Sequence, residues 1–368
     1  MNPIGRAVRA AYRHVLRRWR RLRHITLPIA LEHRRLRGYT SVIGSVVPGA
    51  VDHSLGRYAI FVIFPQDDRL DPSVERALAA LVRAGVDTAV VSNVGLSPAM
   101  VDQLRPLAWR IVQRANVGFD FGAYKDAVEY LGRERPDLER LLILNDSVFY
   151  ASRGLDDYVR ELLGPEDVVA AFENWGEGYH LQSFGLSVSG SVFRSAVFQA
   201  YWKAYVPVSN RIHAIQAGEK RLSDAALRAA ASSRVVYSAS ALYDRLREAP
   251  AEDRADTRIL PKPYREALAA TAGPTFSIAE QARSLVDFVN TTSPIHSGAH
   301  LFPKYLGCPI YKKDLVYRQR FEFWDLDDLL KEVLDPAELE EFMLAIRRKG
   351  DHRRLSKADL AKYLVGVK

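Results

Sequence analysis

The sequence lacks several features that would assign a protein class at once. It has one cysteine, Cys308, among 368 residues, so neither an intramolecular disulfide nor a zinc site built from cysteines can form. A reducing, cytoplasmic setting is therefore expected. No apolar run approaches the roughly 20 residues that a spanning helix needs, and no apolar signal-peptide core follows the basic start. We therefore expect a protein that is soluble or peripheral on a membrane.

Two common nucleotide-binding motifs are also missing. The chain contains neither the glycine fingerprint of dinucleotide-binding folds nor a Walker A sequence. These absences count against a dehydrogenase and against a P-loop enzyme. A hydrophobic content of 48% is nonetheless typical of a globular protein and not of a disordered one.

Positive charge is concentrated at the N-terminus. Residues 1–37 contain eleven arginines and one acid, Glu32, which gives +10 there and leaves −2 for the rest of a chain with net charge +8. Apolar residues recur at helical spacing between Ile4 and Leu22, so we predict a basic amphipathic helix. Such a helix suits an anionic membrane surface, to which each arginine contributes about 1 kcal/mol. The alternatives are nucleic-acid binding, which the net negative body disfavours, and a solvated arm.

The rest of the chain alternates between strand and helix patterns. A β-favouring run precedes a helix that begins at Pro72, and a second apolar run follows within about 36 residues, as in a βαβ unit with parallel strands. Strands are predicted at 58–64, 88–93, 109–113 and 141–150, and helices at 72–84, 97–107 and 123–131. We therefore predict an α/β fold with a mixed, mainly parallel sheet flanked by helices.

Polar residues follow these predicted strands. The apolar run Leu141–Leu144 leads into Asn145, Asp146 and Ser147, and Ser92 with Asn93 end an earlier strand. In open α/β sheets such strand ends lie at one edge and bind ligands, so a nucleotide crevice is predicted. A simple turn is the alternative for the triplet, because Asn, Asp and Ser are common turn residues.

The densest polar stretch, residues 114–125, follows the strand at 109–113. Gly118 and Gly122 permit close backbone approach to a ligand, and Arg114 and Lys125 can meet a diphosphate. Two further side chains there, Asn116 and Asp120, can hold sugar hydroxyls. The alternative is a loop that leads into a helix, with Asp120 as the N-cap.

These motifs resemble the rhamnan synthesis F family of bacterial polysaccharide glycosyltransferases. The resemblance extends over about residues 57–317. It rests on Arg-x-Asn-x-Gly-x-Asp-x-Gly-x-Tyr-Lys at 114–125, Asn-Asp-Ser at 145–147, His180 to Ser183, Glu219 before Leu222 and Ser223, and Gly307 to Lys313. It implies a transferase domain at 57–317. Charge indicates a basic segment at 1–37, proline and glycine indicate a linker at 38–56, and apolar spacing predicts C-terminal helices within 318–368.

The layout is also similar to GT-A glycosyltransferases, in which a metal-binding Asp-x-Asp motif occupies the place of residues 145–147. The resemblance implies that Asp146 helps to bind Mg²⁺ or Mn²⁺. Because the triplet has one carboxylate and not two, metal dependence stays open, and basic side chains can share the neutralisation of the diphosphate.

The resemblance also implies roles for individual residues. Glu219 is the predicted catalytic base, with Asp224 in reserve. The donor nucleotide is expected at Phe64, Ser92, Asn93, Arg114, Asn116, Gly118, Asp120, Gly122, Lys125, Asn145, Asp146 and Ser147. Sugar contacts are expected at Trp175, His180, Gln182 and Ser183, although Trp175 also suits a core position. Diphosphate contacts are expected at His296, His300, Lys312 and Lys313.

The implied activity is transfer of a sugar, with rhamnose favoured, from a nucleoside-diphosphate donor such as dTDP- or GDP-rhamnose. The implied acceptor is a growing polysaccharide on a lipid carrier. The basic segment would then hold the protein on the inner face of the cytoplasmic membrane. A non-catalytic scaffold that binds sugar nucleotides is the alternative, since the triplet has a single carboxylate.

Overall fold

The computed structural model describes residues 25–176, 178–249, 260–270 and 278–350. The predicted amphipathic helix between Ile4 and Leu22 therefore lies outside the described residues. The same holds for residues 351–368 of the predicted C-terminal helical region. The end of the basic segment is described, and it contains the helix α2 (Leu27–Arg35).

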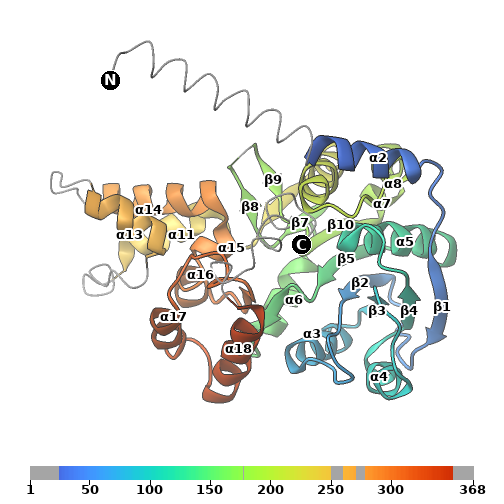
Figure 1. Ribbon diagram of the computed structural model, residues 1–368, viewed down its shortest axis with the longest axis horizontal. Coiled ribbons are helices and arrows are strands. Elements are labelled where there is room, and N and C mark those ends of the chain that lie inside the picture. The colour runs from blue at the N-terminus through green and yellow to red at the C-terminus, as the bar shows by residue number, and fades with distance from the viewer. Residues whose placement is uncertain (1–24, 177, 250–259, 271–277, 351–368) are drawn as a thin grey trace, which may run out of the picture.

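Eight strands form one sheet in the order β1-β4-β3-β2-β5-β10-β7-β11 (Figure 1). They are Ile43–Pro48 (β1), Arg57–Ile63 (β2), Asp87–Ser92 (β3), Arg110–Arg114 (β4), Arg140–Asn145 (β5), Val168–Ala170 (β7), Gly185–Ser189 (β10) and Ser233–Val235 (β11). Four of the seven neighbouring pairs are parallel, namely β2 with β3, β2 with β5, β3 with β4 and β7 with β11. The other three are antiparallel. The predicted α/β fold with a mixed, mainly parallel sheet is confirmed.

The order of the parallel strands reverses at β2. The chain passes from β2 to β3 and β4 on one side and then returns to place β5 on the other side. The register pairs Val62 with Asn145, so the two chains leave β2 and β5 side by side. This is the point at which open α/β sheets bind ligands, and the predicted triplet lies there.

One strand lies within the predicted linker. Ile43–Pro48 pairs with β4 and forms an edge of the main sheet. Its side chains are mostly exposed, as is usual for an edge strand. Gly44 and Pro48 suggest a linker in the sequence, but Pro is tolerated at a sheet edge because its missing N–H removes no interior hydrogen bond. The folded body thus begins before residue 57.

Helices cover both faces of the sheet because alternate residues of the central strands point to opposite sides. Phe61 and Ile63 belong to one core, whereas Ile60 and Val62 belong to the other. The first core includes residues of α3 (Pro72–Arg83), α4 (Pro98–Leu104), α6 (Leu155–Leu162), α11 (Ala239–Glu248), α14 (Ile278–Thr292), α15 (Pro294–Ser297), α16 (Leu301–Leu306), α17 (Phe323–Leu330) and α18 (Pro336–Lys349). The second includes residues of α5 (Phe119–Glu134), α7 (Gly190–Arg194), α8 (Ala196–Ala204) and α10 (Lys220–Ala229).

A small second sheet brings the C-terminal region to the predicted triplet. β6 (Val148–Tyr150) pairs antiparallel with β12 (Ile310–Lys312), and Lys312 lies opposite Val148. Residues more than 160 positions apart therefore meet at the end of β5. Two further short strands, β8 (Glu173–Asn174) and β9 (His180–Leu181), form a hairpin nearby. None of the described helices is both long and apolar enough to span a bilayer.

Candidate functional site

A cavity of about 410 Å³ lies beside the carboxyl end of β5. Many of the predicted site residues line it, although they come from distant parts of the chain. They are Asp120, Asn145, Ser147, His180, Gln182, Ser183, Glu219, His296 and Lys312. The fold therefore brings predicted donor, acceptor, diphosphate and base residues into one space.

The first turn of α5 forms one wall of this cavity. Gly118 has a φ of 76°, which glycine adopts without strain, and a Cβ at Gly122 would lie 1.9 Å from the Val117 carbonyl oxygen. These two glycines allow the tight entry into α5. Asp120 lies in the first turn, where its Oδ2 accepts a hydrogen bond from Asn145 Nδ2 at 3.1 Å. The helix therefore begins at Phe119, and its N-cap is Gly118 and not Asp120.

Asp120 has an unusual electrostatic environment. Burial, together with the negative charge of Asp146, raises its pKa to about 6. Burial also raises the pKa of Asp146. The negative charge of Asp146, just after β5, therefore acts on Asp120 in the first turn of α5.

Asn145, Ser147 and Lys312 form a chain of hydrogen bonds. The backbone N–H and the hydroxyl of Ser147 both donate to Asn145 Oδ1, at 3.1 and 2.6 Å. Lys312 Nζ donates to Ser147 Oγ at 2.8 Å and lies 4.1 Å from the ring centre of Phe184. Burial lowers the pKa of Lys312 to about 8, so its ammonium loses its proton more readily than an exposed lysine.

Glu219 is held on the other side of the cavity. The backbone N–H and hydroxyl of Ser183 both donate to its Oε2, at 3.0 and 2.9 Å. His180 Nε2 lies 3.5 Å from Oε1, while His180 Nδ1 is 2.9 Å from the Gly178 carbonyl oxygen. Burial acts to raise the pKa of Glu219, but these contacts with His180 and Ser183 lower it overall. Glu219 is therefore an oriented carboxylate at neutral pH.

A π-helical turn sets the position of Glu219. This turn, η3 (Ala214–Glu219), links the short helix α9 (Arg211–His213) to α10. Tyr201 donates to the Gly218 carbonyl oxygen at 3.1 Å, which ties the turn to α8. Such turns inside longer helical segments are frequent at functional sites.

Four cations that line the cavity are not among the predicted residues. They are Arg211, Lys220, Arg318 and Arg320. With Lys312 they face the carboxylates of Asp120 and Glu219, so the lining is net positive. The cavity therefore suits an anionic ligand. Nothing local in the sequence marks these four, because each resembles an ordinary surface charge.

The structure does not bring Arg114 and Lys125 to the cavity. Arg114 forms a fully buried ion pair with Asp126 at 2.8 Å and also bonds Asn93. Lys125 forms an ion pair with Glu129 at 2.9 Å and bonds the Trp202 carbonyl oxygen. The expected contact of these two cations with a diphosphate is therefore wrong for this cavity, because both are buried and already bonded to other groups of the protein.

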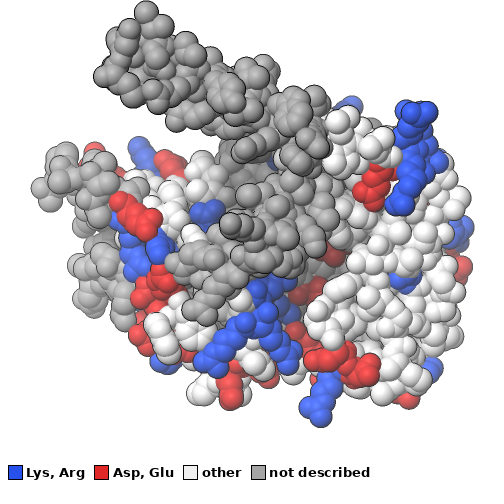
Figure 2. All heavy atoms as spheres, in the orientation of Figure 1, with Lys and Arg blue, Asp and Glu red and all other residues white. Residues whose placement is uncertain are grey.

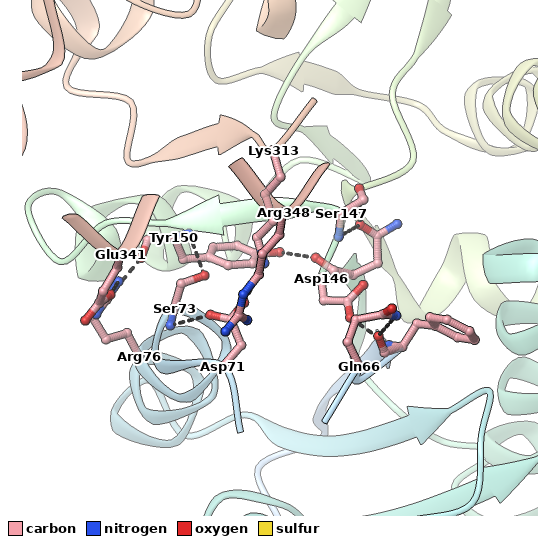
Figure 3. Close-up of polar contacts among 12 residues, drawn as sticks. Gln66, Asp71, Ser73, Arg76, Asp146, Ser147, Tyr150, Lys313, Glu341 and Arg348 are labelled. Atoms are coloured by element: carbon pink, nitrogen blue, oxygen red, sulfur yellow. Dashed lines mark hydrogen bonds and ion pairs between the residues drawn. The ribbon is translucent and has the colours of Figure 1, made fainter. Parts of the chain in front are cut away.

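The other predicted donor residues lie at the sheet edge or outside it. Asp146 Oδ2 accepts from the Phe64 backbone N–H at 2.6 Å, which joins the ends of β2 and β5 (Figure 3). Ser92 donates to the Val94 carbonyl oxygen at 2.8 Å, and Asn116 is exposed. Among the described residues, no group of three His, Cys, Asp or Glu side chains could hold a metal ion. Asp146 is therefore not part of a complete set of protein ligands for a metal ion among the described residues.

The two predicted histidines are separated. His296 lines the cavity and lies between Ser293 Oγ at 2.7 Å and Asp314 Oδ1 at 2.8 Å. Burial lowers its pKa to about 4, so it is neutral at pH 7. His300 lies 3.5 Å from Glu332 and is not part of the cavity lining.

Three more predicted residues lie away from the cavity lining. Lys313 pairs with Asp71 at 2.7 Å beside the end of β2. Trp175 is 53% exposed, which excludes the core position that the sequence also allows. Asp224 is exposed beside Arg228 and lines a different groove.

Comparison with known proteins connects the site with a family. Residues 88–259 match the family described as rhamnan synthesis protein F. The resemblance is confirmed over this stretch, which includes residues 114–125, the 145–147 triplet and Glu219.

One curated relative and two solved structures are similar to parts of the chain. The uncharacterized protein y4gN of Sinorhizobium fredii (strain NBRC 101917 / NGR234) is 30% identical over 159 residues, which is 41% of this chain and 40% of that protein. The chain therefore spans well under half the length of this relative. The galactosyltransferase LgtC, solved with donor and acceptor sugar analogs, is 12% identical with a TM-score of 0.28, covering 62% of this chain and 83% of that one. The mannosyltransferase PcManGT from Pyrobaculum calidifontis, solved with GDP-Man and Mn²⁺, is 12% identical with a TM-score of 0.32, covering 89% and 95%. Scores this low carry no argument about activity.

Proposed function

We propose that the protein is a glycosyltransferase that moves a sugar from a nucleoside-diphosphate donor to a growing bacterial cell-surface polysaccharide. The observation that carries the proposal is the cavity beside β5, which combines a cationic lining with an oriented carboxylate, Glu219. The match to the rhamnan synthesis family supports a place in polysaccharide synthesis.

Each part of the cavity has a role in this proposal. Lys312, fixed to Ser147, meets the diphosphate oxygens, and Arg318 and Arg320 add positive charge to the cavity lining. The acceptor hydroxyl lies beside Glu219, which takes its proton as the oxygen attacks the anomeric carbon. The bond from that carbon to the diphosphate breaks, and the leaving group carries the electron pair.

His180 and Ser183 are positioning residues in this scheme. Ser183 directs two hydrogen bonds to one oxygen of Glu219, and His180 lies beside the other. The carboxylate is therefore held in one orientation before the acceptor arrives. Gln182 also lines the cavity and can bond a sugar hydroxyl.

The finer parts of the proposal follow the family description. We propose that the sugar is rhamnose, from dTDP- or GDP-rhamnose, and that the acceptor is attached to a lipid carrier. We also propose that the basic segment at 1–37 holds the protein on an anionic inner membrane face. Asp146 can hold Mg²⁺ or Mn²⁺ together with diphosphate oxygens and water, since Mg²⁺ commonly uses only one or two carboxylates.

The test uses purified protein, a panel of dTDP-, GDP- and UDP-sugars and a polysaccharide acceptor. Glu219→Gln should reduce transfer by about 10²- to 10⁴-fold, the usual contribution of a general base, while the Kd for the donor stays unchanged. The matched control is Asp224→Asn, a carboxylate-to-amide change five residues on and outside the cavity, which should leave transfer unchanged.

Two outcomes would contradict the proposal. Normal turnover by the Glu219→Gln variant would remove this residue from the role of base. Donor binding without any transfer by the unaltered protein would favour a scaffold that binds sugar nucleotides.

A further inference from the structure

Helix α18 is fixed against the strands that surround the triplet. The Phe342 ring lies 5.0 Å from the Phe149 ring in β6 and 5.5 Å from the Tyr311 ring in β12. Phe149 comes two residues after Ser147, and Tyr311 directly precedes Lys312. The helix therefore packs on both strands that frame this part of the site.

Polar contacts set the direction of the same helix. Glu338 accepts from the Ser152 backbone N–H at 2.7 Å and lies 3.3 Å from Arg76 of α3. Arg76 also lies 2.8 Å from Glu341 (Figure 3). Glu338 is buried, so these contacts are shielded from water. With its first turns held in this way, the helix ends at Lys349 beside the carboxyl edge of the sheet.

The end of α18 carries three cations, Arg347, Arg348 and Lys349. Arg348 lies 3.8 Å from Asp67, which follows β2. Burial raises the pKa of Asp120 and of Asp146, and the positive charge of Lys349 acts in the opposite direction on both. Lys349 is the last residue of α18 and directly follows Arg348.

The surface has the corresponding charge pattern. Figure 2 shows Lys and Arg side chains in the lower middle of the molecule, where Figure 1 places α18, next to Asp and Glu side chains. The ion pair of Arg348 with Asp67 is more than half exposed on both sides. Such pairs contribute little, so a ligand with two phosphates can compete for Arg348.

We propose that Arg348 and Lys349, with Lys313, form a cationic subsite for the diphosphate of the sugar nucleotide at the ends of β2 and β5. This inference rests on the proposed function and adds a role for the C-terminal helix. The triplet has one carboxylate with which to hold a divalent cation, where the Asp-x-Asp motif has two. Basic side chains near Asp146 therefore supply positive charge that neutralises the leaving diphosphate. Helix packing supplies that charge from a segment about 200 residues after the triplet.

The test compares two double variants of the full chain. Arg348→Gln/Lys349→Gln removes the subsite charges. The matched control, Lys331→Gln/Arg347→Gln, removes the same number of charges from the groove between α17 and α18, which is away from the strand ends. Kd values for GDP, UDP and dTDP are measured by calorimetry, and melting temperatures confirm folding.

We expect about tenfold weaker binding of the preferred nucleotide by the subsite variant and no change in the control. Equal affinity of the subsite variant and the control would overturn the inference, even if the unaltered protein binds and transfers normally. Failure of the unaltered protein to bind any of the three nucleotides would instead refute the proposed function, and the inference with it. If the double variant melts early, the single Arg348→Gln change at an exposed position makes the same comparison.

Discussion

Arg114 and Lys125 lie inside the protein and pair with carboxylates, whereas Lys312 lines the cavity and bonds a serine hydroxyl. The ion pair of Arg114 with Asp126 compensates two charges that the fold has fully buried. The nitrogen of Lys312 is bonded to a serine hydroxyl and not to a carboxylate, so its charge is available to an anion. The hydrogen-bond partner of a cation thus separates a structural role from a binding role. The following substitutions test this difference.

The largest expected effect is on stability. Arg114→Met removes one member of a fully buried ion pair and leaves Asp126 uncompensated, so the free energy of unfolding should fall by about 3–5 kcal/mol. Urea denaturation measures this change. Lys313→Met, at a partly exposed pair, is the control and should change stability far less. A change below about 1 kcal/mol for Arg114→Met would show that the buried pair is not structurally important.

At Lys312 we expect an effect on nucleotide binding and little effect on stability. Lys312→Met removes a charge-assisted contact with the proposed diphosphate, so nucleotide Kd should rise about 10- to 100-fold. The free energy of unfolding should change little, because no carboxylate loses a hydrogen-bonded partner. Unchanged nucleotide affinity in a folded variant would place Lys312 with the structural cations.

A pH dependence follows from the same lysine. Lys312 is charged below its pKa of about 8 and neutral above it, so nucleotide affinity should fall as the pH rises from 7 to 9. The second phosphate ionisation, near pH 6, is already complete in that range. Lys312→Arg keeps its charge and should remove the dependence. If this variant shows the same fall, another group is responsible.

The smallest effect is expected at Asp71. Its pair with Lys313 is partly exposed, so Asp71→Asn should cost less than about 1 kcal/mol of stability. The change also frees Lys313 for an anion, and nucleotide affinity should rise slightly. Weaker binding would mean that Asp71 is needed to position Lys313.

Local patterns in the sequence were sufficient to predict the central strands and the crevice. Continuous apolar runs such as Leu141–Leu144 specify strands buried on both faces, and parallel pairing brings their polar ends to one edge. The strand β1 was not predicted, because its pairing with β4 depends on residues about 65 positions away.

The cations of the cavity show the same limit. Arg211 and Arg320 are more than 100 residues apart, and neither belongs to a motif. Arg114 shows the reverse case, since a basic residue in a glycine-rich loop resembles a phosphate ligand until its partner, Asp126 on the next helix, is known. Sequence distance hides both relationships, because burial and pairing are decided by the fold.

The π-helical turn at Ala214–Glu219 has a consequence for how this site can change. Successive helical residues are separated by about 100° around the axis, so removing one residue from the turn ahead of Glu219 would rotate α9 relative to Glu219 and α10. Glu219 would keep its place at the start of α10, whereas Arg211 of α9 would turn away from the cavity that it lines. The site is therefore sensitive to the length of this segment, and homologous chains that lack one residue here are expected to keep the base but to lose the cation that Arg211 supplies.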